Sequence, residues 1–221
     1  QSSGSSGGGA VGSPEPAVNV EVKEITKEVV TSGKRADFNF SKNATCVVYV
    51  SFDAKKTFGK TTAIAEMLKG KSVLVPELPS GEVYKSFNVW VGNGGVATSK
   101  NIDNPVICFK VEKEWIKDEN IDPESISLNR YNQNDKKWEE LSAHLLNEDN
   151  KFLYFTADVP GFASFAITGK VKNTLENATQ IDLESGIPSL KRDSAKDIGF
   201  KISQNKERQK APGFEFTYVV V

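Results

Sequence analysis

Short apolar runs separated by polar turn residues are the feature that most constrains the fold of this chain. Between Pro105 and Gly169 these runs follow one another closely, and Ile107–Val111 alternates apolar and other side chains with the period of two that is typical of a β-strand. No regular alternation of strands with helices is visible. We therefore predict an all-β protein, an Ig-like antiparallel β-sandwich with extended N- and C-terminal tails.

The individual elements are predicted from the same periodicity. Thr61–Leu68 fits either a helix or a strand, and we favour a strand because Gly70 would end a helix after about two turns. One helical turn is expected at Glu114–Asn120. A hairpin over Asn132–Asp135 is expected to join Ile126–Arg130 to Trp138–Leu141, and a last hairpin is expected to turn on Val159–Phe162. The other predicted strands are Val18–Val30, Ala36–Phe40, Cys46–Phe52, Tyr84–Val91, Ile107–Val111, Ile126–Arg130, Trp138–Leu141, Phe152–Ala157 and Phe162–Ile167.

Composition changes along the chain divide it into four regions. Residues 1–17 are rich in Ser, Gly and Pro and are expected to be a flexible leader or an expression tag. Residues 18–169 form the predicted sandwich. Residues 170–210 carry many charges and amides but little apolar surface, which indicates a polar linker. Residues 211–221 hold a Pro-Gly-Phe motif and an apolar stump.

The charge balance and the known motifs argue against several chemistries. The net charge of −1 gives no basic surface for nucleic acid, and the single histidine, His144, leaves little for acid–base or metal chemistry. Gly59-Lys60-Thr61 resembles the end of a phosphate-binding loop, but Ala54 stands where the first glycine belongs. We predict no catalytic residue, cofactor, metal or nucleotide site. Asp118–Asp122 lacks the calcium-loop pattern, and the three tryptophans are expected to pack rather than to form a sugar platform.

Two cysteines and three sequons suggest covalent modifications. Cys46 and Cys108 lie in apolar runs, and they could be buried small hydrophobes, a disulfide between the sheets in an oxidising compartment, or a two-thiolate metal site with too few partners. Asn39, Asn43 and Asn177 each begin an N-x-[ST] sequon for N-glycosylation. Asn43 is the better placed of the first two, because it lies in a predicted turn.

Several of these motifs together resemble one known family. The chain is similar to the PGF-pre-PGF domain of archaeal, mostly methanogen, cell-surface proteins. The similar segments are residues 13–24, Val106–Trp115, Leu128–Tyr131, Lys137–Leu141 and Val159–Gly169. A second Pro-Gly-Phe motif follows at Pro212, Gly213 and Phe214. This resemblance implies export and a C-terminal sorting motif that an archaeosortase processes for lipid attachment. The family's hydrophobic helix and basic tail do not follow Val221, so membrane contact would require an anchor absent from this chain. The resemblance implies no catalytic residue.

The function expected from these observations is structural. The leading hypothesis is a non-catalytic, extracellular module of the cell surface or envelope, with other cell-surface proteins or copies of itself as partners. The alternative is a self-assembling filament or sheath subunit that uses a terminal tail as a donor strand, with Phe216, Tyr218, Val219, Val220 and Val221 as candidate residues. A glycan-binding adhesion domain is the second alternative. Nucleic acid and nucleotides are not expected as partners.

Overall fold

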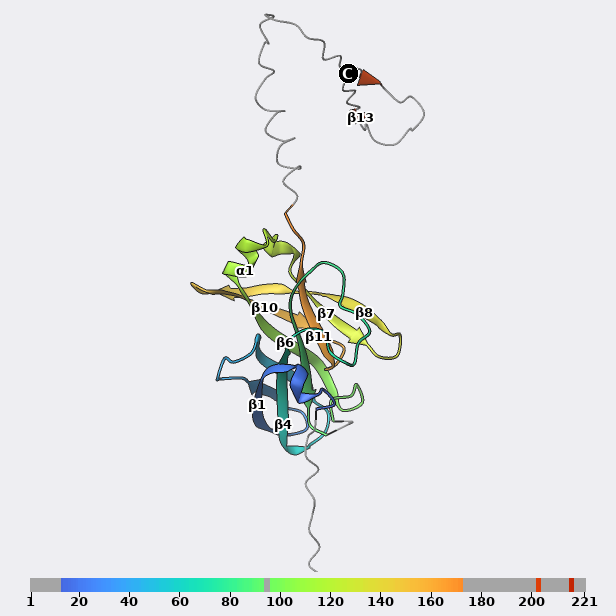
Figure 1. Ribbon diagram of the computed structural model, residues 1–221. Helices are drawn as coiled ribbons and strands as arrows, with labels where there is room; N and C mark the ends of the chain where they lie inside the picture. Colours follow the sequence, from blue (N-terminus) through green and yellow to red (C-terminus); the bar gives the residue numbers. More distant parts are fainter. Residues whose placement is uncertain (1–12, 94–95, 173–201, 204–214, 217–221) are drawn as a thin grey trace, which may run out of the picture. The chain divides into compact units, whose positions relative to one another are not determined.

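The computed structural model describes residues 13–93, 96–172, 202–203 and 215–216 of the chain. The chain divides into two units, Gln1–Lys172 and Asn173–Val221, which are considered separately. In the described part of the first unit the elements are η1 (Ala17–Asn19), β1 (Val20–Val30), β2 (Arg35–Asn39), β3 (Val47–Ala54), β4 (Gly59–Leu68), β5 (Glu82–Val91), β6 (Ile102–Glu112), α1 (Lys113–Asp118), η2 (Pro123–Ser125), β7 (Ser127–Asn132), β8 (Lys137–Ser142), β9 (His144–Glu148), β10 (Phe152–Asp158) and β11 (Ser164–Gly169) (Figure 1).

These strands form two antiparallel sheets. One sheet has the strand order β1-β4-β5-β11-β7-β8, and the other has the order β2-β3-β6-β10-β9. The all-β, two-sheet prediction is confirmed, whereas its finer Ig-like assignment stays a prediction. No helix in the described ranges is long and apolar enough to cross a bilayer.

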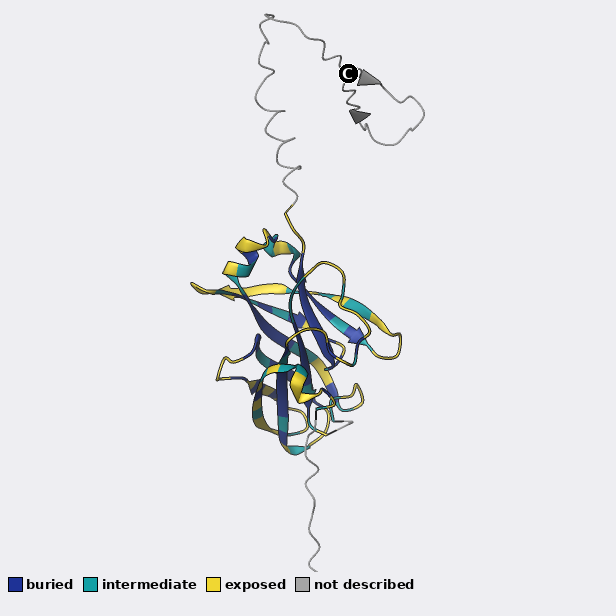
Figure 2. Cartoon of the chain, viewed as in Figure 1, coloured by how far each residue is buried: buried dark blue, intermediate teal, exposed yellow. Residues whose placement is uncertain are grey.

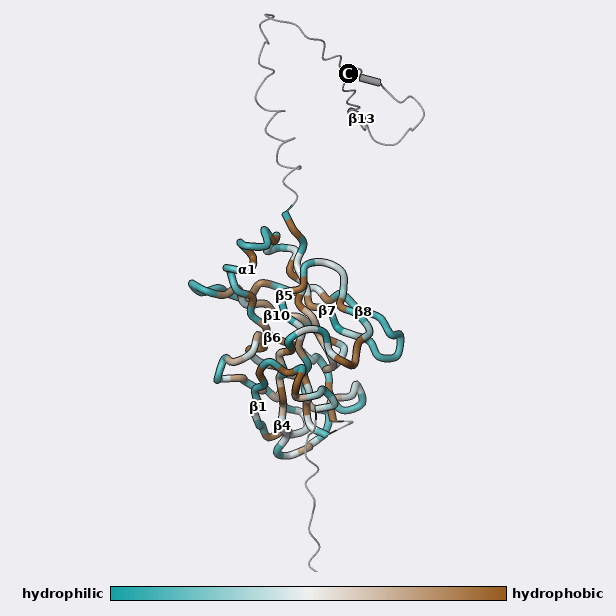
Figure 3. The backbone as a smooth tube through the Cα atoms, in the orientation of Figure 1, coloured by the Kyte–Doolittle hydropathy of each residue, from teal (hydrophilic) through white to brown (hydrophobic). Residues whose placement is uncertain are grey.

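The core lies between the sheets and is built mainly from alternate residues of the inner strands β3, β4, β5, β6, β10 and β11. In β6, Ile107, Phe109 and Val111 belong to the core, as the period of two predicts. Aromatic pairs reinforce each sheet: the Phe87 and Phe165 rings lie 5.4 Å apart, and Phe109 stacks on Phe155 at 5.6 Å. Such pairs add about 0.5–1.5 kcal/mol each beyond the area they bury. Figure 2 shows buried residues concentrated on the strands, and Figure 3 shows apolar segments along the same paths.

Three local predictions are confirmed. The ambiguous segment Thr61–Leu68 is part of β4, a strand paired on both sides, with β1 and with β5. The expected helical turn is α1, and the predicted hairpin is formed by β7 and β8, with Tyr131 opposite Trp138.

The predicted last hairpin is wrong. β10 pairs with β6 and β9, whereas β11 pairs with β5 and β7 in the other sheet. The segment between them therefore crosses the sandwich, and Arg130 Nε donates to the Gly161 carbonyl oxygen at 3.2 Å on the way. Every residue of β11 is buried. This burial on both faces fits the position of β11 inside its sheet, between β5 and β7.

One strand was not predicted. β9 contains Leu145 and Leu146, each 59% exposed, and all of its residues are exposed. Because these leucines are adjacent, the sequence shows no alternation there, and β9 forms through its backbone pairing with β10.

The expected domain boundaries also need correction. Composition places residues 13–17 in the flexible leader, but Ser13 Oγ donates to Glu66 at 2.6 Å, and Glu15 is buried. At the other end, Val171 pairs with Ile121, beyond the predicted limit at residue 169. The described folded body therefore extends over residues 13–172, apart from residues 94–95.

The second unit contains two short described strands. β12 (Ile202–Ser203) pairs antiparallel with β13 (Glu215–Phe216), so the predicted linker and the predicted stump each contribute one strand. The candidate donor residue Phe216 lies in β13. Pro212, Gly213 and Phe214 of the sorting motif and Tyr218, Val219, Val220 and Val221 lie outside the described residues.

Candidate functional site

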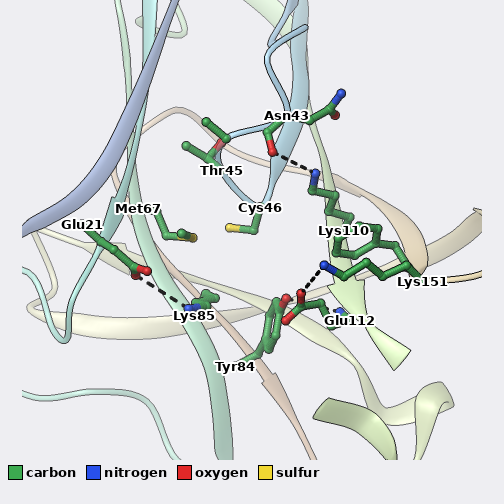
Figure 4. Close-up of a pocket in the computed structure, with 12 residues that line it drawn as sticks. Glu21, Asn43, Thr45, Cys46, Met67, Tyr84, Lys85, Lys110, Glu112 and Lys151 are labelled. Atoms are coloured by element: carbon green, nitrogen blue, oxygen red, sulfur yellow. Dashed lines mark hydrogen bonds and ion pairs between the residues drawn. The ribbon is translucent and has the colours of Figure 1, made fainter. Parts of the chain in front are cut away.

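A pocket of about 290 Å³ opens where the loop before β3 meets both sheets. Figure 4 shows its lysine and glutamate side chains arranged around the thiol of Cys46. The lining residues are Glu21, Asn43, Ala44, Thr45, Cys46, Met67, Tyr84, Lys85, Lys110, Glu112, Lys151 and Phe152.

The loop over the pocket is held by backbone and side-chain hydrogen bonds. The buried carboxylate of Glu24 accepts from the backbone N–H groups of Lys42 and Ala44, the second at 3.1 Å. Asn43 has φ of 54°, a left-handed conformation that asparagine tolerates better than most residues. The Thr45 hydroxyl is buried and accepts from the N–H of Val47 at 3.2 Å. The loop therefore has a fixed shape.

Two of the three pocket lysines are paired with carboxylates. Lys85 Nζ lies 3.7 Å from Glu21, and Lys151 Nζ lies 3.2 Å from Glu112. Both pairs are drawn in Figure 4. These four residues are partly exposed, so each pair contributes little to stability, about 0–1 kcal/mol.

Lys110 is different, because it is only 7% exposed and forms no ion pair with any carboxylate of the described residues. Its Nζ donates to the backbone oxygen of Asn43 at 3.3 Å and lies 4.7 Å from the centre of the Phe152 ring. A lysine ammonium has three N–H donors. One carbonyl and one ring face leave its positive charge only partly compensated.

The floor of the pocket is formed by protonated groups. Burial raises the pKa of the Cys46 thiol to about 12, so the thiol stays protonated near neutral pH and is a poor nucleophile. Burial also raises the pKa of Tyr84, whose hydroxyl oxygen accepts from the N–H of Glu112 at 3.3 Å. The Tyr84 ring packs 4.9 Å from the Trp115 ring. The site thus holds three lysines, two carboxylates and protonated Cys46 and Tyr84, and its one excess positive charge suits the binding of an anion better than proton transfer.

No disulfide joins the two cysteines in this structure. Cys46 and Cys108 are both buried and both free thiols. Cys46 belongs to the core cluster, whereas Cys108 lies outside it, opposite Tyr49 across the β3–β6 pairing. Burial raises the pKa of Cys108 to about 11. The first of the three interpretations, two buried small hydrophobes, describes these surroundings.

The sequon residues that the structure describes are exposed. Asn39 ends the edge strand β2, and Asn43 lies in the turn at the rim of the pocket. Asn177 lies outside the described residues. Glycosylation of all three stays a prediction.

The other motifs have structural surroundings of their own. Gly59 and Lys60 begin strand β4, whereas a phosphate-binding loop would lead into a helix. Asp122 caps η2 by accepting from the N–H of Glu124 at 3.1 Å. In the part of the chain that the structure describes, no group of three or more His, Cys, Asp or Glu side chains is arranged to hold a metal ion.

Each tryptophan contacts a different partner within the fold. Trp90 Nε1 donates to Glu66 at 3.0 Å, and Trp138 Nε1 donates to the Glu77 carbonyl at 2.9 Å. Trp115 packs on Tyr84 and against the core. Trp115 thus packs against the core as expected, whereas Trp90 and Trp138 are half-buried and do not belong to the core cluster.

Sequence reasoning missed a buried carboxylate network next to β4 and β5. Glu15 accepts hydrogen bonds from the side chains of Asn19, Ser72 and Asn88 and from the N–H of Val73. Most of these partners are far away in the sequence, so no local pattern could identify them. The signal that was available is a carboxylate between two prolines, Pro14 and Pro16, in a segment rich in small polar residues.

Comparison with known proteins identifies no relative of this chain. No protein-family model, no curated protein and no solved structure matches the chain. The resemblance to the PGF-pre-PGF domain therefore stays a proposal that depends on the motifs themselves.

Proposed function

We propose that this chain is a non-catalytic structural module of an archaeal cell surface or envelope, as its resemblance to the PGF-pre-PGF domain implies. The observation that supports the proposal best is the use of the buried carboxylates. Glu15, Glu24 and Glu66 each accept at least two hydrogen bonds from within the folded body. Carboxylates committed in this way rigidify a sandwich and are not available to a substrate.

The location is tested on intact cells of the source organism. A membrane-impermeant biotin ester is added before lysis, and the protein is captured with an antibody against the sandwich. We expect labelling without permeabilisation, at an efficiency similar to that of a known surface protein, while a cytoplasmic enzyme in the same cells stays unlabelled. Labelling that requires permeabilisation would contradict the proposal.

Self-assembly is a second candidate function, which strand β9 favours. Of the described strands, only β10 pairs with β9, so its outer edge presents unpaired backbone groups together with Leu145 and Leu146. Exposed apolar edges of this kind readily accept a further strand. We propose that the occupant is the apolar C-terminal segment 216–221 of a second copy, which has high β-propensity.

Light scattering, which measures the molar mass of the full chain in solution, tests whether the protein self-assembles. We expect oligomers that dissociate on Leu145→Lys and on truncation after residue 210. Val73→Lys is the matched control, because Val73 is also a highly exposed apolar residue, at 57%, and lies outside the strands. A wild-type chain that stays monomeric at concentrations of about 0.1 mM, where even modest assembly affinities would be visible, would refute self-assembly through β9.

A further inference from the structure

We propose that the pocket around Lys110 binds a small sugar acid, a molecule with one carboxylate and several hydroxyl groups such as a uronic acid. This ligand adds to the structural role proposed above and does not depend on the location of the protein or on its assembly. The inference is carried by the charge, the hydrogen-bonding groups and the size of the pocket.

The net charge of the pocket favours a ligand that carries one negative charge. Three ammonium groups and two carboxylates line it, which leaves an excess of one positive charge. That excess is located at Lys110, because Lys85 and Lys151 are each paired. One ligand carboxylate would neutralise it, whereas a phosphate dianion would bring a surplus negative charge close to Glu21 and Glu112.

The hydrogen-bonding groups match a polyhydroxylated acid. Lys110 uses one N–H on Asn43 and has further donors for a ligand carboxylate. The Tyr84 hydroxyl is already engaged by Glu112, because it accepts from the Glu112 N–H and also hydrogen-bonds the Glu112 side chain, so the donors for a ligand come from Lys110. The carboxylates of Glu21 and Glu112 supply acceptors for ligand hydroxyl groups. Each of these carboxylates keeps its lysine partner and still has lone pairs for a ligand hydroxyl, which a simple fatty acid would not use.

The size of the pocket sets an upper limit on the ligand. About 290 Å³ lies at the small end of the range for small-molecule sites, roughly 300–1,000 Å³. One monosaccharide fits such a volume better than an extended oligosaccharide. A longer chain would bind only through one residue placed in the pocket.

Titration of the full chain with glucuronate tests the proposal, with glucose and inorganic phosphate as comparison ligands. Binding is followed by isothermal calorimetry and by amide chemical shifts. We expect glucuronate to bind saturably and to shift the amides of Cys46, Tyr84 and Lys110. Glucose is expected to bind at least about tenfold more weakly, because it lacks the charge-assisted hydrogen bonds.

Variants locate the binding site. Lys110→Met is expected to weaken glucuronate binding by about tenfold or more, and Lys110→Arg is expected to restore most of it. Lys85→Met provides a second, more exposed test if Lys110→Met does not fold. Lys27→Met is the matched control on the same molecule, since Lys27 is exposed on β1 and outside the pocket.

Each alternative outcome is informative. Glucuronate binding that Lys110→Met and Lys85→Met leave unchanged would refute this pocket as the site. Phosphate binding as tightly as glucuronate, or glucose binding equally well, would refute the sugar-acid class. The absence of saturable glucuronate binding would overturn the proposal, and it would leave the surface-labelling result unaffected.

Discussion

Replacing Glu15 tests whether the segment before β1 is part of the folded body. This carboxylate is only 6% exposed, although it lies in a stretch whose composition predicts a flexible leader. Glu15→Ala removes the acceptor for four donors, of which Asn88 and Ser72 are almost completely buried. We expect a clear loss of stability.

The magnitude follows from the two buried donors. An unsatisfied buried donor costs about 1–3 kcal/mol, and water entering the space left by the side chain recovers part of that cost. We therefore expect the free energy of unfolding to fall by about 3 kcal/mol. For a body of this size, that loss lowers Tm by about 6–12 °C.

Glu15→Gln separates the charge from the shape. Among the described residues, none donates a hydrogen bond to the side-chain oxygen of Asn88, so the Asn88 amide can rotate to accept from the new glutamine. We expect a smaller loss than for the alanine variant, about 1–2 kcal/mol, because charge-assisted hydrogen bonds are replaced by neutral ones.

The pH dependence gives an independent test of the same carboxylate. Burial by itself raises the pKa of Glu15, but the hydrogen bonds from Ser72, Asn19, Val73 and Asn88 outweigh it, so the pKa lies below its ordinary value of 4.5. A lowered pKa stabilises the fold above the unfolded value, and this contribution is lost as the pH falls through the folded value. The stability gap between wild type and Glu15→Gln should therefore close as the pH falls below 4.5.

The measurement is urea unfolding at several pH values, followed by tryptophan fluorescence. Glu28→Gln, an exposed glutamate on β1, is the control and should change the free energy by less than about 0.5 kcal/mol. If Glu15→Ala behaves like this control, the segment is not docked and the reasoning about the network is refuted.

Two further predictions concern the cysteines and the crossing between the sheets. Burial raises the pKa values of Cys46 and Cys108 to about 12 and about 11, so neither thiol should react with iodoacetamide at pH 8 until urea is added. A mass of the intact protein that is two hydrogens lower would reveal a disulfide and contradict this prediction. Arg130→Met should lower the free energy of unfolding in urea by about 1–2 kcal/mol, because it removes the hydrogen bonds to Gly161 and Glu139. Arg35 is more exposed, and Arg35→Met should lower it by less than about 0.5 kcal/mol. Equal losses would refute a special role of Arg130 in the crossing between the sheets.

Local patterning was sufficient to predict the fold class and most of the strands. The alternation in Ile107–Val111 predicts a strand wherever the segment lies, because successive side chains of a strand point to opposite faces. The β7–β8 hairpin was also predictable, since its two strands are close in sequence and joined by turn residues. The candidate site was not predicted, although its lysines are ordinary residues of the sequence.

Tertiary structure alone decided strand order, the docked N-terminal segment and the pocket. The two strands of the expected last hairpin are consecutive, yet β10 lies in one sheet and β11 in the other, between β5 and β7. Alternation identifies an inward face for each strand, but it does not say which sheet the strand joins. Lys85 and Lys110 come from strands of different sheets, and Glu15 finds Asn88 at a separation of 73 residues. Periodicity determines which residues point inward, but only the complete packing determines which inward or rim residues meet.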